Sequence, residues 1–193
     1  MTIDLEKIVT IVPDVDARHV ATFCERIVSG QRAQSVRCEP DLTAPENECF
    51  AAVSAQVAKH GGDQVIGWAL WEFQGVYVEA ELHSVWRSPA GDLIDISPRG
   101  TAFEQILFLP DPTRVDDGRT IDNVRLALVA DNDVKRYLFL CGQHYKILNA
   151  GDRALQREVS LGRRELKALQ DLQKEINRLR NRLAKRYVLG SSS

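Results

Sequence analysis

The chain has 193 residues, of which 44% are hydrophobic and 27% are charged, with a formal net charge of −2. This length suits one buried core with an appendage, and the sequence lacks the run of about 18 apolar residues that a membrane span needs. Its first seven residues lack the basic and then apolar pattern of a secretory signal. We therefore expect a soluble, cytoplasmic protein with no membrane partner and with four reduced cysteines.

Charge is distributed unevenly along the sequence. Residues 153–187 contain 11 Lys or Arg and 4 Asp or Glu, a net charge of +7, so the remainder carries −9. A basic tail on an acidic body can bind a polyanion, dock on an acidic partner or lie along its own domain.

The N-terminal part of the sequence predicts two helices. The first runs from about residue 16 to 32, because its apolar residues recur at helical spacing, with Asp14 or Asp16 as its cap. A polar, turn-rich segment follows from Gln34 to Glu48. The second helix begins at Cys49 and stops at the Gly61-Gly62 pair.

Three strands are expected next, at residues 65–73, 76–87 and 92–96, because these runs are rich in β-branched and aromatic residues. Gln74-Gly75 and Ser88–Gly91 have the composition of hairpin turns. Another short apolar run at 106–109 is closed by Pro110-Asp-Pro112.

The C-terminal third predicts short helices at 123–129 and 134–140, with a strand as the alternative for the second, and a break at Gly151. A helical tail from 153 to 188 follows, in which five apolar residues alternate at spacings of three and four, as in the a/d seam of a coiled coil. Pairing with a second copy and docking on the same chain both remain open. The expected division is therefore an α+β domain over 1–150 and a basic helical tail over 151–193. The seam residues are Leu169, Leu172, Ile176, Leu179 and Leu183.

Cys49, His83 and Asp95 have the local settings of a thiol-based catalytic triad. A cysteine in a first helical turn meets free backbone N–H groups and the positive end of the helix dipole, which favour the thiolate. His83 and Asp95 lie on strands joined by a hairpin turn, so antiparallel pairing would bring imidazole and carboxylate together. His83 would take the thiol proton, and Asp95 would orient the imidazole. Asn47 is a candidate donor to the oxyanion.

Residues 47–98 resemble the core of papain-like thiol enzymes, and more closely the transglutaminase-like branch. In that branch a cysteine at a helix N-terminus precedes strands that carry His, in a His-Ala-Trp-like run, and then Asp, before an Asp-x-x-Pro-like turn. Cys49-Phe50, His83-Ser-Val-Trp86 and Asp95-Ile-Ser-Pro98 follow this order. The Cys-Trp pair common in transglutaminases is missing, so hydrolysis or deamidation by water fits as well as transfer.

The resemblance implies a papain-like or transglutaminase-like α+β fold with an antiparallel sheet, to which the sequence pattern of the tail adds a C-terminal amphipathic helix. It also implies a peptide or amide substrate that forms a thioester on Cys49, with no cofactor. The alternative function is a non-catalytic protein-interaction module that uses residues 153–188 to bind a protein partner or a second copy.

Two other classes of site are not expected. Glu79, Glu81, His83 and Asp95 could converge on a metal, but one histidine without a Cys-x-x-Cys pair is a poor transition-metal signature. Nucleotide-binding glycine motifs are missing. We also expect no nucleic-acid partner, because the body is acidic and the tail has a single aromatic, Tyr187, for base stacking.

Overall fold

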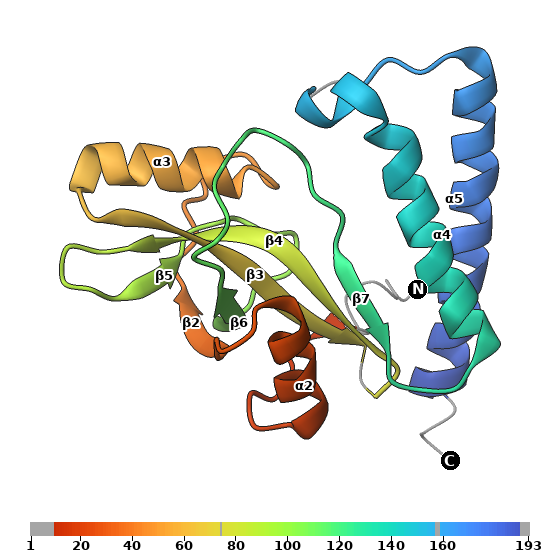
Figure 1. The fold of residues 1–193 in the computed structure, drawn as a ribbon, viewed down its shortest axis with the longest axis horizontal. Coiled ribbons are helices and arrows are strands. Elements are labelled where there is room, and N and C mark those ends of the chain that lie inside the picture. The colour runs from red at the N-terminus through yellow and green to blue at the C-terminus, as the bar shows by residue number, and fades with distance from the viewer. Residues whose placement is uncertain (1–9, 74, 157–158, 190–193) are drawn as a thin grey trace. The chain divides into compact units, whose positions relative to one another are not determined.

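The structure of the chain is a computed structural model that describes residues 10–73, 75–156 and 159–189 (Figure 1). It combines helices and strands and has a long helix near the C-terminus, so the predicted α+β class is confirmed. Contacts divide the described residues into two compact units. The sheet unit comprises 11–72 and 79–117, and the helical unit comprises 73–78 and the residues from 118 onward. This division differs from the expected boundary at residue 150.

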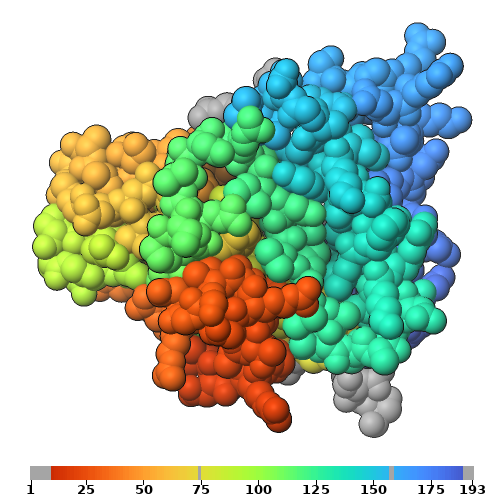
Figure 2. All heavy atoms as spheres, viewed as in Figure 1, coloured from red at the N-terminus to blue at the C-terminus, as the bar shows by residue number. Residues whose placement is uncertain are grey.

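The sheet unit contains two helices and most of the strands. The helix α2 buries Val20, Phe23 and Cys24, and the orange-red surface in the lower part of Figure 2 includes its exposed face. In chain order the elements are β1 (Thr10–Ile11), α2 (Arg18–Ile27), β2 (Gln34–Cys38), α3 (Cys49–His60), β3 (Asp63–Phe73), β4 (Tyr77–Arg87), β5 (Leu93–Asp95) and β6 (Gln105–Pro110). One or two end residues of β1, β3 and β4 belong to the helical unit.

The strands of this unit pair in a ring. β3 pairs antiparallel with β6, β6 antiparallel with β2, β2 parallel with β5, and β5 antiparallel with β4. A further pairing between β3 and β4 closes the ring. The sheet is thus mainly antiparallel, as expected, but it contains the parallel pair β2–β5.

Alternate positions on these strands contribute to one core. Val36, Ala69, Val85, Ile106 and Phe108, from four different strands, are at most 1% exposed. A second cluster holds α3 against β5, because Val53 of the helix packs with two isoleucines of the strand segment. The start of α3 is therefore held beside β5. These isoleucines are Ile94 and Ile96.

The helical unit is built on two long helices, α4 (Asn132–Leu148) and α5 (Arg163–Ala184). They run antiparallel, and ion pairs join the start of α4 to the end of α5, as between Asp133 and Arg182 at 3.2 Å (Figure 1). Shorter elements complete the unit: the strand β7 (Val124–Ala127), the 3₁₀ helix η1 (Gly151–Leu155) and the π-helical turn η2 (Lys185–Leu189).

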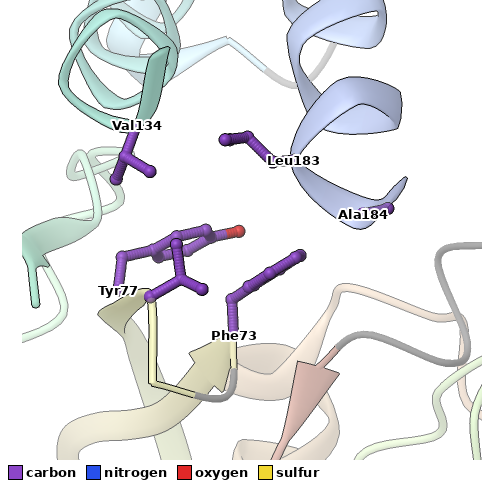
Figure 3. Close-up of a cluster of buried hydrophobic side chains, with 6 residues drawn as sticks. Phe73, Tyr77, Val134, Leu183 and Ala184 are labelled. Atoms are coloured by element: carbon purple, nitrogen blue, oxygen red, sulfur yellow. The ribbon is translucent and has the colours of Figure 1, made fainter. Parts of the chain in front are cut away.

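Three of the five seam residues of the tail are buried within their own chain. Ile176 and Leu179 pack with Leu140 of α4. Leu183 joins a second cluster, in which the aromatic side chains of residues 73 and 77 stack at 5.4 Å between ring centroids (Figure 3). Of the two alternatives for the seam, the structure therefore contains intramolecular docking. Phe73, Tyr77, Val134, Leu183 and Ala184 are labelled in that figure.

Several predicted elements were wrong or misplaced. Residues 34–38 form a strand instead of a turn; only Val36 is buried there, so the segment has no apolar periodicity. Residues 124–127 form β7 and not a helix. The expected caps of α2 are also wrong, because the residue before the helix is Ala17 and no side chain caps it. Residues 134–140 are helical, but within the longer α4, and α5 begins only after Gly162.

None of the helices in the described part of the chain is both long enough and apolar enough to cross a membrane.

Candidate functional site

Cys49 is the first residue of α3, as the sequence predicts. The preceding Glu48 is the N-cap and its side chain makes no capping hydrogen bond, so the N–H groups of the first turn are not capped by it. The first turn contains no acidic residue that would offset the helix dipole. Cys49 is partly buried and is a free thiol.

His83 and Asp95 lie on neighbouring antiparallel strands, and the expected contact between them is present. The register pairs Trp86 with Ile94, which places His83 and Asp95 on the same face of the β4–β5 pair. His83 Nε2 lies 3.0 Å from Asp95 Oδ1. The two residues are 4% and 0% exposed, so this hydrogen bond is shielded from water.

The imidazole also contacts the thiol. Cys49 is close enough to His83 for the thiol to raise the pKa of the imidazole. Because Nε2 engages Asp95, Nδ1 is the ring nitrogen left for the sulfur. The three residues that the sequence singled out therefore interact in the order thiol, imidazole, carboxylate within the sheet unit.

The site favours an imidazolium beside a carboxylate. Burial by itself lowers the pKa of His83, but hydrogen bonds to Asp95 and Cys49 outweigh it and raise this pKa to about 9. Burial likewise opposes ionisation of Asp95, yet the hydrogen bond and charge of His83, together with the charge of Arg99, lower the pKa of Asp95 to about 2. Both charged forms are therefore present at neutral pH.

Arg99 is a fourth charged group of the site, and sequence reasoning missed it. Its Nη1 pairs with Asp95 Oδ2 and donates to the Ser97 carbonyl at 3.3 Å, while the guanidinium lies 5.4 Å from the centre of the Trp71 ring. Its Nη2 also lies 3.1 Å from His83 Nε2. His83 Nε2 cannot both donate a hydrogen bond to Asp95 and accept one from Arg99. We assign the Nε2 hydrogen to the bond with the Asp95 carboxylate, because the hydrogen bond between imidazole and carboxylate is charge-assisted. No motif marks Arg99, which follows Pro98 in a loop.

Cys38 lies on the other side of Asp95. The parallel register of β2 and β5 aligns the two residues, and the Cys38 Sγ is 3.8 Å from Asp95 Oδ2. Burial, and then the nearby negative charge of Asp95, raise the pKa of Cys38 to about 11. Cys38 is therefore a protonated donor to the carboxylate and a poor nucleophile. It was missed because its strand was predicted as a turn.

Gln64 connects the element that carries the thiol to the strand that carries the imidazole. Its side-chain nitrogen donates to Ser84 Oγ at 2.9 Å and to the Phe50 carbonyl at 3.4 Å. Phe50 follows Cys49 and Ser84 follows His83 in the chain. The amide thus helps to hold the start of α3 beside β4.

Asn47 lies in the loop before α3 and is exposed. Its φ of 63° places it in the left-handed region, which asparagine tolerates better than most residues. Its side chain makes no hydrogen bond to another described residue. The structure thus gives no evidence for the expected oxyanion role, which stays a prediction.

The described residues contain no group of three or more His, Cys, Asp or Glu side chains placed to hold a metal ion. Of the four residues considered as ligands, Glu81 accepts a hydrogen bond from the indole of Trp71 at 3.2 Å. His83 and Asp95 bind each other, and Glu79 is only partly buried.

No family model, curated protein or solved structure matches the chain.

Proposed function

We propose that the sheet unit is a cysteine-dependent enzyme of the papain-like or transglutaminase-like kind, which cleaves or transfers the acyl group of an amide or peptide bond. The observation that carries this proposal is the buried His83–Asp95 hydrogen bond, with the Cys49 thiol at a helix start and close enough to His83 to raise the pKa of its imidazole. A buried thiol with a purely structural role has no need of an imidazole held by a carboxylate.

The reacting state is a Cys49 thiolate beside the His83 imidazolium, with the thiol proton held on the ring. The thiolate attacks the carbonyl carbon of the substrate, and the candidate donors for the oxyanion are the Cys49 N–H at the helix start and the Asn47 amide. The tetrahedral intermediate then breaks its C–N bond, and the imidazolium gives its proton to the leaving amine. A thioester remains on Cys49.

His83 acts again as a base in the second half of the reaction. It takes a proton from water, for hydrolysis, or from an acceptor amine, for transfer, as that nucleophile attacks the thioester. The Cys49 sulfur leaves as a thiolate beside the imidazolium, which now holds the proton taken from the nucleophile, and the starting ion pair is restored. Asp95 keeps the ring in one orientation and stabilises its charged form through both steps, without taking up the proton itself.

The alternative of a non-catalytic assembly module has less support. It needs a tail whose apolar seam is free to meet a partner, whereas Ile176, Leu179 and Leu183 are buried against residues of the same chain. It also gives no reason for the buried His83–Asp95 pair.

The test is acylation by a small activated ester, p-nitrophenyl acetate, followed by mass spectrometry of the peptides that contain Cys24, Cys38, Cys49 and Cys141. We expect an acetyl group on Cys49 first, and on the order of tenfold less or slower labelling in His83→Ala, because an unassisted thiol is only a few per cent thiolate at pH 7. His60→Ala, in the last turn of α3, is the matched control and should label as the wild type. If Cys49 were the slowest cysteine, or if His83→Ala labelled it equally fast, the proposal would be rejected.

A further inference from the structure

The solvent face of α5, continued by the first residue of η2, carries a row of basic side chains. At 3.6 residues per turn these side chains fall within an arc of roughly 60°. They lie opposite Ile176, Leu179 and Leu183, which face the core of the helical unit. We call these basic side chains the basic row, and all five of them are exposed. The members of the basic row are Arg163, Lys167, Lys174, Arg178 and Lys185.

Most of the basic row is not neutralised by the chain itself. Lys174 contacts Asp171 at 3.4 Å, and both side chains are largely exposed, so this pair is weak. The other four members form no ion pair with any residue that the structure describes. By contrast, Arg182 and Arg186, on another face of the helix, pair with acidic residues at the start of α4. The row therefore presents a positive field to solvent.

The length of the basic row suits an extended anionic partner. From its first to its last member it spans 22 residues, which at 1.5 Å per residue corresponds to about 33 Å. Figure 2 shows blue side chains of α5 reaching outward at one edge of the view. A regular array of this length matches repeated charges better than a single small anion.

We propose that the basic row binds the phosphate backbone of duplex nucleic acid without reading its sequence. A protein partner would need apolar or aromatic anchors in the centre of the interface, and the row has none. A membrane surface would need the apolar face of the helix, which is buried in the helical unit. Single strands are bound by stacking on aromatic side chains, which the row also lacks. Repeated phosphates need only the cations that are present.

This inference is independent of the proposed thiol chemistry, and it revises the expectation of no nucleic-acid partner. That expectation rested on the missing aromatic side chains and on the acidic body. Neither prevents contact between a basic helix face and a sugar–phosphate backbone, because such contact needs no base stacking.

The experiment is fluorescence anisotropy of two labelled 20-bp DNA duplexes of unrelated sequence, titrated with the full chain from 20 to 200 mM KCl. We expect equal binding of both duplexes, with a slope of log K against log[KCl] of about −4.5 for five phosphate contacts. Substituting Lys167, Lys174 and Arg178 together by Gln, a good helix former, should reduce the steepness of this slope by about 3 and weaken binding at least tenfold.

The matched control removes three exposed cations of the sheet unit, Arg26, Arg32 and Lys59, again by substitution with Gln. It changes the net charge equally and should bind as the wild type. The proposal is overturned if the wild type fails to bind at 20 mM KCl, or if both variants weaken equally. Tighter binding to poly-glutamate, or to vesicles containing phosphatidylserine, would overturn it in favour of an acidic protein or a membrane surface. Circular dichroism would establish that both variants keep α5.

Discussion

Asp95 is the residue on which the other polar groups of the site converge. Its Oδ1 accepts from His83 and from the Ser97 N–H at 3.1 Å, and its Oδ2 meets Arg99 and the thiol of Cys38. The carboxylate is completely buried. Both oxygens are thus satisfied by donors, and only an ionised group can accept from all four at once.

Replacing Asp95 by Asn should impair both stability and reactivity. The amide keeps the size of the side chain but brings an NH₂ group against donors and leaves the charge of Arg99 unpaired. We expect the free energy of unfolding to fall by about 3 kcal/mol, as for other broken buried ion pairs, and Cys49 alkylation at pH 7 to slow at least tenfold. Urea unfolding and iodoacetamide labelling would measure the two effects. Asp92→Asn, at an exposed position just before β5, should change neither; unchanged labelling in Asp95→Asn would remove Asp95 from the proposed mechanism.

The pH dependence of stability should report the charged state of His83. Its pKa in the folded chain, about 9, lies above its ordinary value of 6.5. Its contribution to stability is therefore fully present below pH 6.5 and is lost as the pH rises through 9. The difference in unfolding free energy between the wild type and His83→Gln should shrink by about 3 kcal/mol between these limits. Urea titrations at pH 6 and pH 9.5 would measure it, and a difference that did not change would show that the imidazole is neutral in the folded protein.

At the scale of secondary-structure elements, the sequence predicted those parts of the site whose signals are local. The start of α3 follows from an apolar run after polar residues, and β4 and β5 follow from their composition and the turn between them. Because the hairpin also sets the pairing of these strands, the contact between His83 and Asp95 could be expected. No comparable signal in the sequence indicates contacts between segments that are far apart in the chain.

The parts of the site that could not be predicted depend on pairing between distant segments. Cys38 reaches Asp95 only because β2 pairs parallel with β5, 57 residues later in the chain. β2 is held by ladders on both of its sides and buries only Val36, so its own sequence carries little strand signal. Arg99 reaches the site from an irregular segment, for which no periodicity exists. Tertiary pairing, and not local propensity, positions both residues.

Replacing Gln64 tests whether the link between the start of α3 and β4 holds Cys49 close to His83. Gln64→Ala removes both hydrogen bonds of the amide and leaves Ser84, which is 0% exposed, without that donor. We expect a loss of about 1 to 2 kcal/mol in stability, and Cys49 alkylation several-fold slower because the thiol is held less closely to His83. Thermal unfolding and labelling kinetics would measure these changes. Gln31→Ala, at an exposed loop position, is the control; a stability loss without slower labelling would limit Gln64 to a purely structural role.

At the scale of the whole molecule, the two units have separate cores and opposite charges. By sequence, residues 11–72 and 79–117 carry a net charge of −9, and the rest of the chain carries +7. Of the apolar clusters described above, those of the sheet unit and those of the helical unit have no residue in common. The proposed acyl chemistry and the proposed phosphate binding therefore depend on different sets of packed residues, and mutations in one core should leave the other function intact.

The two cores can be perturbed one at a time, and the chain contains its own probes for each. All three tryptophans, at positions 68, 71 and 86, belong to the sheet unit, whereas the two longest helices belong to the helical unit. Tryptophan fluorescence therefore reports unfolding of the sheet unit, and circular dichroism at 222 nm reports mainly unfolding of the helical unit.

Leu179→Ala should lower the free energy of unfolding of the helical unit by about 2 to 5 kcal/mol, because Leu179 is only 2% exposed. We expect it to move the urea midpoint of the 222 nm signal and to leave the fluorescence midpoint and Cys49 alkylation nearly unchanged. Ile106→Ala, at a completely buried position of the sheet unit, should do the reverse. If each variant shifted both probes by the same amount, the chain would unfold as one cooperative unit, and the separation of the two cores would have no energetic meaning.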